Sequence, residues 1–321
     1  MKAQRFKVAP GVWGMKDIFV NFYFIETGEN NNWVLVDAGL KTSYKKIKNA
    51  ASEMFSGKPP KAIILTHGHF DHVGALNKLL ADWHVPVYAH YLELPYLEGK
   101  SSYPPPDSSV GGGLMATVAD LYPATPIVVH ANITALQEDE AIPCLKGWRS
   151  IHTPGHAPGH ISLFREEDSV LIAGDAFVTT RQESALAVMF QKKELNPPPA
   201  YFTYDWHAAE ASVKKLKLLA PEVAATGHGK PMYGKELRTA LQRLHEHFYD
   251  KAVPKKGRYA EDPAIADVNG VLYVPPEVYN PKLKLIMATG LIAIGIITIS
   301  AVLTTMVKNK KRYTLMPGLR F

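Results

Sequence analysis

Short apolar runs alternate with turns along the first half of the chain, and helical spacing of apolar residues is more frequent later. Runs of roughly four to eight residues rich in Val, Ile and aromatic side chains are typical of β-strands. The predicted strands are Ile18–Ile25, Trp33–Asp37, Ala62–Leu65, Val85–Ala89, Ile127–His130 and Ile161–Phe164. The predicted helices are Tyr44–Met54, Gly74–Leu80, His207–Leu219 and Glu236–Phe248. Early strands mixed with later helices favour two sheets with helices on their outer faces.

The pattern changes near the C-terminus, where Leu285–Val307 carries no charged residue and is rich in Ile, Leu, Ala and Thr. As a helix this stretch would reach about 35 Å, enough to cross the hydrocarbon core of a bilayer. Basic residues follow directly and could meet lipid headgroups. We therefore expect a catalytic domain over residues 1–250, a linker over 251–281, a transmembrane helix over 282–308 and a short basic tail over 309–321.

Composition fits a globular protein with a sizeable core, because 46% of the 321 residues are hydrophobic and 21% are charged. The basic charge belongs to the tail: residues 281–321 contain seven basic and no acidic residues, so removing them from the net +6 leaves −1 for residues 1–280. Nucleic-acid binding therefore has no electrostatic support. Cys144 is the only cysteine, which permits a reducing compartment.

The expected location is a membrane, with residues 285–307 as a single span. The N-terminus lacks the apolar core of a secretory signal. The basic residues after the span favour a cytoplasmic C-terminus, which would place the preceding domain outside, although long domains respond weakly to this bias. We expect the catalytic domain on the cytoplasmic side.

Candidate metal ligands are concentrated in one run that follows the predicted strand Ala62–Leu65. The run is Thr66-His67-Gly68-His69-Phe70-Asp71-His72, with four potential ligands within six positions. Three further candidates each follow a short apolar stretch and lie beside glycine, namely His156, Asp175 and His228. Imidazole suits zinc and iron, and a carboxylate adds an anionic ligand. Glycine lets the backbone bend sharply near a bound ion. His152 and His160 are alternatives to His156 as the third histidine ligand.

This set resembles the metallo-β-lactamase superfamily, in its glyoxalase II-like and lactonase-like branch with the H-x-H-x-D-H signature. The resemblance covers roughly residues 9–250 and implies an α/β fold, an αβ/βα four-layer sandwich with the metals at one edge between the sheets. It assigns His67, His69 and His156 to a first metal. It assigns Asp71, His72 and His228 to a second metal, and Asp175 as the bridge between the two. The superfamily pattern favours the first His after Thr153-Pro154-Gly155, which is His156.

The resemblance implies hydrolysis of an ester, thioester or lactone of a small molecule. Two zinc ions, with iron or manganese as alternatives, would lower the pKa of a bound water to about 7. Asp71 would be a ligand that also handles a proton. Periplasmic β-lactamases of the superfamily have a signal peptide and often Cys at the position of Asp175, so antibiotic hydrolysis is not expected. Two alternatives remain open: a mononuclear iron persulfide dioxygenase, and a non-catalytic membrane-tethered metal-binding module.

Two long irregular stretches, residues 99–125 and 177–204, are candidates for substrate-binding loops. The first contains three consecutive prolines and three consecutive glycines, and the second contains three consecutive prolines before an aromatic cluster. The candidate apolar substrate wall consists of Leu114, Met115, Phe190, Tyr201 and Phe202. Ordinary packing is the alternative interpretation for each of them. The sequence gives no prediction of the oligomeric state.

Overall fold

The computed structural model describes residues 4–28 and 31–278. The transmembrane helix and basic tail expected over 282–308 and 309–321 lie outside the described residues. Among those that are described, no helix combines the length and the apolar run that crossing a bilayer requires.

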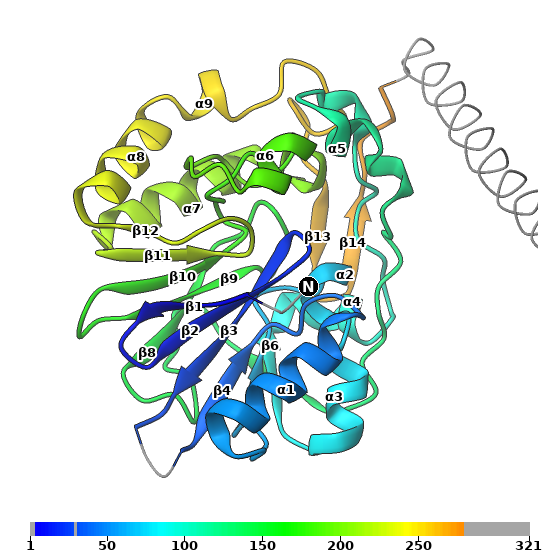
Figure 1. Cartoon of the computed structure of the whole chain (residues 1–321). Helices are drawn as coiled ribbons and strands as arrows, with labels where there is room; N and C mark the ends of the chain where they lie inside the picture. The colour runs from blue at the N-terminus through cyan, green and yellow to red at the C-terminus, as the bar shows by residue number, and fades with distance from the viewer. Residues whose placement is uncertain (1–3, 29–30, 279–321) are drawn as a thin grey trace, which may run out of the picture. The chain divides into compact units, whose positions relative to one another are not determined.

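The first sheet has seven strands in sequence order (Figure 1). Its strands are β1 Gln4–Ala9, β2 Val12–Asp17, β3 Val20–Glu26, β4 Trp33–Val36, β5 Ile63–Ile64, β6 Val87–His90 and β7 Ile133–Leu136. Strands β1 to β4 pair antiparallel, and β4 to β7 pair parallel. All four residues of β4 are buried, as expected for a strand covered on both faces.

The second sheet has five strands in the order β12-β11-β10-β9-β8. Its strands are β8 Trp148–His152, β9 Ile161–Arg165, β10 Val170–Gly174, β11 Val223–Thr226 and β12 Met232–Tyr233. Only β10 and β11 run parallel within it. A separate hairpin is formed by β13 Ile265–Asp267 and β14 Gly270–Tyr273.

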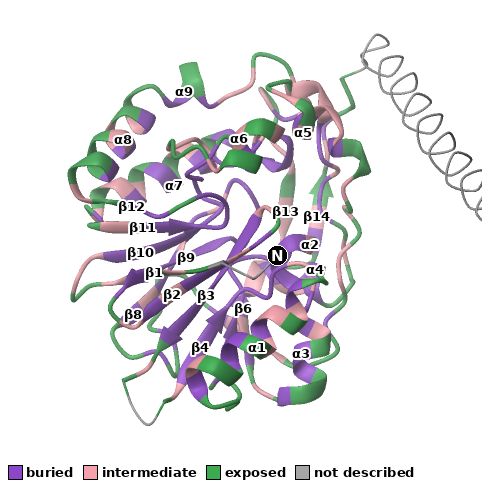
Figure 2. Ribbon diagram, in the orientation of Figure 1, coloured by how far each residue is buried: buried purple, intermediate pink, exposed green. Residues whose placement is uncertain are grey.

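Helices cover the outer face of each sheet, which gives the four-layer αβ/βα sandwich expected from the resemblance (Figures 1 and 2). The helices are α1 Ser43–Phe55, α2 Phe70–Val73, α3 Leu76–Trp83, α4 Leu94–Leu97, α5 Leu114–Thr117, α6 Ala185–Phe190, α7 Trp206–Leu218, α8 Gly234–Glu246 and α9 Phe248–Lys251. Short 3-10 helices are η1 Tyr91–Glu93, η2 Ser108–Val110, η3 Ala119–Leu121 and η4 Ala200–Phe202.

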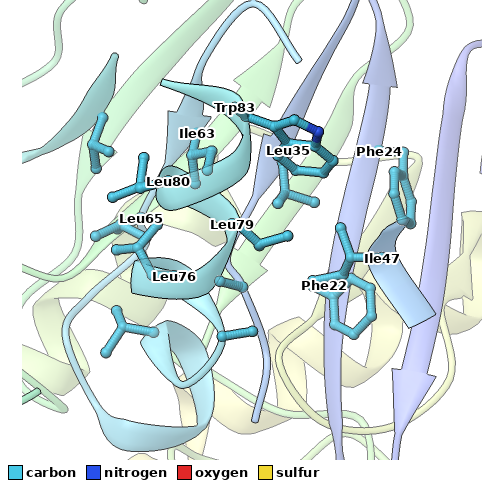
Figure 3. Packing of buried hydrophobic residues seen from close by; sticks show 14 of the residues in the cluster. Phe22, Phe24, Leu35, Ile47, Ile63, Leu65, Leu76, Leu79, Leu80 and Trp83 are labelled. Carbon is cyan, nitrogen blue, oxygen red and sulfur yellow. The ribbon is translucent and has the colours of Figure 1, made fainter. Parts of the chain in front are cut away.

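Three hydrophobic clusters hold the layers together. Helices α1 and α3 pack on the first sheet, where Ile47 and Leu79 meet Phe22, Phe24 and Leu35 (Figure 3). A second cluster fills the space between the sheets, and a third joins α7 and α8 to the outer face of the second sheet. Because both sheets are fixed by burial on two sides, the loops at their shared edge are anchored on rigid elements.

The strand predicted over residues 127–130 is wrong, because the paired strand is β7, Ile133–Leu136. The side chain of Asn77 takes the backbone groups that a sheet would otherwise pair: its Nδ2 donates to the carbonyl of Val128, and its Oδ1 accepts from the N–H of His130. A side chain from α3 therefore makes the backbone hydrogen bonds that a neighbouring strand would otherwise make at this position.

Residues 252–278, expected to be linker, are folded into the same compact unit as the rest of the described chain. Tyr259 is buried, and its hydroxyl donates to the carbonyl of Pro105. The N–H of Arg258 donates to Asp107. The hairpin β13–β14 is tied to the loop after α4 by the N–H of Val271, which donates to a serine hydroxyl there. The body of the protein thus extends to residue 278.

Candidate metal centre

The seven predicted ligands come together at one edge of the two sheets. His67, His69, Asp71 and His72 follow β5, and His156 lies in the loop between β8 and β9. Asp175 directly follows β10, and His228 is the second residue after β11. Strands from both sheets therefore deliver their end loops to a single point. All seven residues are buried, none more than 7% exposed.

The geometry divides the ligands into overlapping groups whose ligand atoms lie within 4.8 Å of one another. One group is His67, His69 and His156; another is Asp71, His72 and His228; a third is His67, His72 and Asp175. Asp175 lies at the centre: its Oδ2 is 3.0 Å from His228 Nε2, 3.5 Å from His156 Nε2 and 3.7 Å from His72 Nε2. One carboxylate thus reaches both histidine groups, as a bridging ligand must.

Two imidazole nitrogens in this cluster have no hydrogen-bond partner in the described part of the chain and are available to bind a cation. Nε2 of His67 and Nε2 of His72 are buried and have no hydrogen-bond partner among the described residues. His69 Nδ1 and His156 Nε2 face each other at 3.0 Å, and two lone pairs at that separation repel unless a proton or a metal ion lies between them. Buried unsatisfied polar groups are costly. The residues present therefore fit divalent cations.

Outer hydrogen bonds orient the ligand rings. Asp37 accepts from His72 Nδ1 at 2.8 Å and also from the backbone N–H and hydroxyl of Thr66. His228 Nδ1 donates to the carbonyl of Phe19 at 2.8 Å, which leaves Nε2 of His228 for a ligand. Such partners fix the tautomer and direction of a metal-binding imidazole. Asp37 was not identified from the sequence, although it directly follows the strand β4 just as Asp175 follows β10.

The other two candidate histidines, His160 and His152, do not belong to these three ligand groups. Both nitrogens of His160 are used by the protein: Nε2 accepts from the N–H of Asp175, and Nδ1 contacts the hydroxyl of Thr153. His152 lies apart, with its ring stacked on His90 at 4.1 Å. Of the three histidines considered as the third histidine ligand, only His156 offers a ligand atom within 4.8 Å of those of His67 and His69, although the ring of His160 lies 5.1 Å from that of His67.

A buried glutamate, also missed by the sequence analysis, joins two of the ligand loops. Glu93 accepts from the N–H of Gly68 and from the N–H of Gly159, both at 2.8 Å, and from the hydroxyl of Tyr103. Gly68 lies between His67 and His69, so this carboxylate connects the first ligand run to the loop that carries His156. No local sequence signal distinguishes Glu93 from a surface glutamate.

Burial and neighbouring charges tune the cluster for cation binding. Burial lowers the pKa of His67 and His69 well below the usual value and that of His156 to about 3, so these rings keep free lone pairs. Burial raises the pKa of Asp71. Burial also opposes charge on Asp175, but His228 and His72 outweigh it and hold the pKa of Asp175 well below the usual value. Burial opposes charge on His72 and His228, but neighbouring carboxylates outweigh it and raise the pKa of both rings. The neutral rings of His67, His69 and His156 beside these carboxylates form an electron-rich site.

A small pocket with aromatic walls opens beside the cluster. It is lined by His69, Asp71, His156, Asp175 and His228 on one side and by Phe19, Phe70, Met115, Tyr122, Pro199, Tyr201 and Phe202 on the other. The ring of Phe202 lies 4.8 Å from the ring of His69. Met115, Tyr201 and Phe202, predicted as part of a substrate wall, line this pocket, and their contact with a substrate stays a prediction. Leu114 and Phe190 do not line it, because their side chains are 62% and 71% exposed.

Comparison with known proteins agrees with this geometry. Residues 15–228 match the family described as "Metallo-beta-lactamase superfamily". The chain belongs to the metallo-β-lactamase superfamily. It is 48% identical over 241 residues to "Probable metallo-hydrolase YflN" of Bacillus subtilis (strain 168), which covers 74% of this chain and 91% of the relative. It is 29% identical over 219 residues to "Probable metallo-hydrolase YybB" of the same organism, covering 68% and 84%.

Solved structures share the superfamily fold at low sequence identity. A metallo-beta-lactamase family protein from Thermus thermophilus has a TM-score of 0.52 and 20% identity, covering 76% of this chain and 81% of that one. A beta-lactamase domain protein from Burkholderia ambifaria has a TM-score of 0.55 and 22% identity, covering 78% and 74%. Family membership, the relatives and the clustered ligands together show a metal-dependent hydrolase.

Proposed function

We propose that this superfamily member hydrolyses an ester, thioester or lactone bond of a small molecule, using two divalent cations, with zinc as the first choice and iron or manganese as alternatives. The observation that carries the proposal is the pair of ligand groups that share Asp175. His67, His69 and His156 would hold one cation, and Asp71, His72 and His228 the other. When bound, two such ions supply Lewis acidity that ionises water near neutral pH and polarises a carbonyl.

The chain's own groups complete this chemistry. Asp71 lines the pocket and lies 3.7 Å from His228 Nε2, and burial raises its pKa, so it can accept a proton close to the reacting atoms. Phe202 and Tyr201 exclude water and form an apolar surface for the substrate. The hydroxyl of Tyr204 lies 3.3 Å from His69 Nε2 and orients that ring.

The gathering of Asp71, His72 and His228 supports the hydrolase over the mononuclear alternative. An iron dioxygenase with one metal needs only one facial group of ligands, whereas here a second complete group is present, with its own ligand atoms within 4.8 Å of one another. A non-catalytic module would not need a pocket with aromatic walls beside Asp71. For the same protein we propose attachment to a membrane through residues 285–307, with the body on the cytoplasmic side, a small-molecule substrate and no nucleic-acid partner.

Metal analysis combined with a substrate panel tests the hydrolase. The full chain is purified anaerobically and in air, its metal content is measured, and hydrolysis of thioesters, lactones, phosphodiesters and β-lactams is compared. We expect two metal ions per chain and turnover of a thioester or lactone. His69→Ala and Asp175→Ala should lose metal and activity, while His130→Ala, an exposed histidine elsewhere, should match the parent.

Opposite results would be equally clear. An Asp175→Ala chain that has lost metal yet hydrolyses the best substrate at the parental rate contradicts the shared-carboxylate site. One iron per chain with oxygen consumption on persulfides favours the dioxygenase. Membrane attachment is tested separately, by whether the full chain stays with vesicles through alkaline extraction, and its orientation by protease accessibility of the body.

A further inference from the structure

Six large apolar residues are exposed on segments that adjoin those of the aromatic pocket. We call them the apolar rim, and each is between 59% and 71% exposed: Ile18, Leu114, Leu121, Leu186, Met189 and Phe190. Single exposed apolar residues are normal, but a contiguous group marks a surface that contacts something apolar.

Three residues of the apolar rim are adjacent in sequence to residues that line the pocket. Ile18, Leu114 and Leu121 each directly precede a residue whose side chain lines the pocket, namely Phe19, Met115 and Tyr122. Successive side chains on these short elements point in different directions. One residue therefore faces the metal centre while its neighbour faces out, which places the rim at the mouth of the pocket.

Helix α6 supplies the rest of the apolar rim. Of its six residues only Val188 is buried, whereas Leu186, Met189 and Phe190 face outward. The helix lies beside α5, because the N–H of Met115 donates to the carbonyl of Glu183 (Figure 1). A Cβ at Gly113 would lie 2.3 Å from that same oxygen, so only glycine allows this approach. Exposed apolar residues of α5 and α6 thus lie on neighbouring segments of the described chain, Leu114 on one and Leu186, Met189 and Phe190 on the other.

The course of the chain indicates which partner meets this surface. Val274 packs in the same hydrophobic cluster as Met115 and Tyr122, so the chain leaves the body close to the pocket. Residues 279–284 separate the described body from the uncharged stretch that begins at Leu285. Six extended residues reach roughly 20 Å. A bilayer that receives residues 285–307 is therefore within reach of the apolar rim.

We propose that the apolar rim rests in the interfacial layer of a phospholipid bilayer and opens the pocket to substrates that carry an acyl chain dissolved in that layer. This rests on the membrane attachment and hydrolase activity proposed above, and it names the substrate class. The acyl chain enters between α5 and α6 along Leu114 and Phe190. Its carbonyl reaches the metal centre past Met115 and Phe202.

Fluorescent labels test the docking without any need for activity. In the full chain with Cys144→Ser, a polarity-sensitive dye is attached at Phe190→Cys or, as a control, at Leu218→Cys on α7, which is apolar and 70% exposed. The chains are reconstituted into phosphatidylcholine vesicles with and without brominated acyl chains. We expect a blue-shifted, bromine-quenched signal at residue 190 and a water-like, unquenched signal at residue 218.

Other outcomes overturn the proposal in distinguishable ways. A water-like signal at residue 190 on vesicle-bound protein refutes the docking alone. A blue shift that ignores brominated lipid but grows with protein concentration shows that a second copy covers the apolar rim instead. A parent chain that does not float with vesicles refutes the membrane attachment, and the docking with it.

A second measurement addresses the substrate. Leu186→Asp combined with Phe190→Asp should lower hydrolysis of a long-chain ester in vesicles at least tenfold relative to a short-chain soluble ester, about 1.4 kcal/mol. Leu218→Asp should leave the ratio at the parental value. An unchanged ratio in the double variant refutes entry from the bilayer. A parent that hydrolyses no ester, thioester or lactone offered, with both metals bound, contradicts the proposed hydrolase, while the labels still decide the docking.

Discussion

Glu93 offers the sharpest test of how the metal centre is held in place. Its side chain is fully buried and accepts from the N–H of Gly68, the N–H of Gly159 and the hydroxyl of Tyr103. The first two donors belong to different ligand loops. The glutamate touches no predicted ligand side chain, so its contribution is the relative position of those loops. Glu93→Gln keeps the shape but replaces one accepting oxygen with an NH2 group.

The size of the effect follows from the contacts. Hydrogen bonds to a charged group contribute about 1.5–3 kcal/mol each, and in Glu93→Gln one N–H donor would face the new NH2 group. Part of this loss is offset because burial raises the pKa of Glu93, which means that its charge is itself costly in the fold. We expect a net loss of about 2 kcal/mol in the free energy of unfolding. Supporting residues of this kind change metal affinity by about 10–100-fold.

Two assays on the full chain measure these effects. Denaturant unfolding of the metal-free protein reports the stability, and competition with a chelator reports the affinity of each metal. Glu98→Gln is the matched control, because Glu98 lies on the same segment but is exposed and paired with Lys100. If Glu93→Gln unfolds at the parental denaturant concentration and holds both metals as tightly as Glu98→Gln, the proposed connection between the loops is refuted.

Three further predictions concern single positions. Tyr204→Phe leaves His69 Nε2 without its neighbour at 3.3 Å and should weaken metal binding about tenfold in chelator competition; equal affinity would count against this orienting role. Gly155→Ala should lower stability by at least about 2 kcal/mol in denaturant unfolding, because Gly155 has φ +126° and a Cβ there would lie 2.5 Å from the backbone N of Ala209; parental stability would contradict it. Burial, with a smaller effect of a neighbouring imidazole, lowers the pKa of His90 to about 3. The unfolded chain, with a histidine pKa of about 6.5, therefore binds a proton that the folded chain does not, and stability falls as pH drops from about 6.5 toward 3. His90→Phe should flatten this slope by up to about 1.4 kcal/mol per pH unit in urea unfolding, and an unchanged slope would show that His90 is not buried as a neutral ring.

Local spacing was enough to predict the ligands that lie close together in the chain. His67, His69, Asp71 and His72 are within six positions, and a short strand followed by a turn and a helix can aim them only at a small region. Helices such as α1 and α7 were also visible, because their buried faces repeat with the helical period. These features depend on neighbours in sequence, so the sequence alone determines them.

Tertiary structure decided everything that depends on contacts between distant segments. It brought a ring nitrogen of His156 to the other ligands, whereas both nitrogens of His160, from the same loop, are engaged by Thr153 and by the N–H of Asp175, and His152 stacks on His90. It selected Asp37 as the partner of His72, and it folded residues 252–278 against the pocket loops. Strand β7 begins further along the chain than predicted, because Asn77 of α3 hydrogen-bonds the backbone groups of residues 128 and 130. Periodicity reports which face of an element is buried, but it carries no information about which distant segment covers that face.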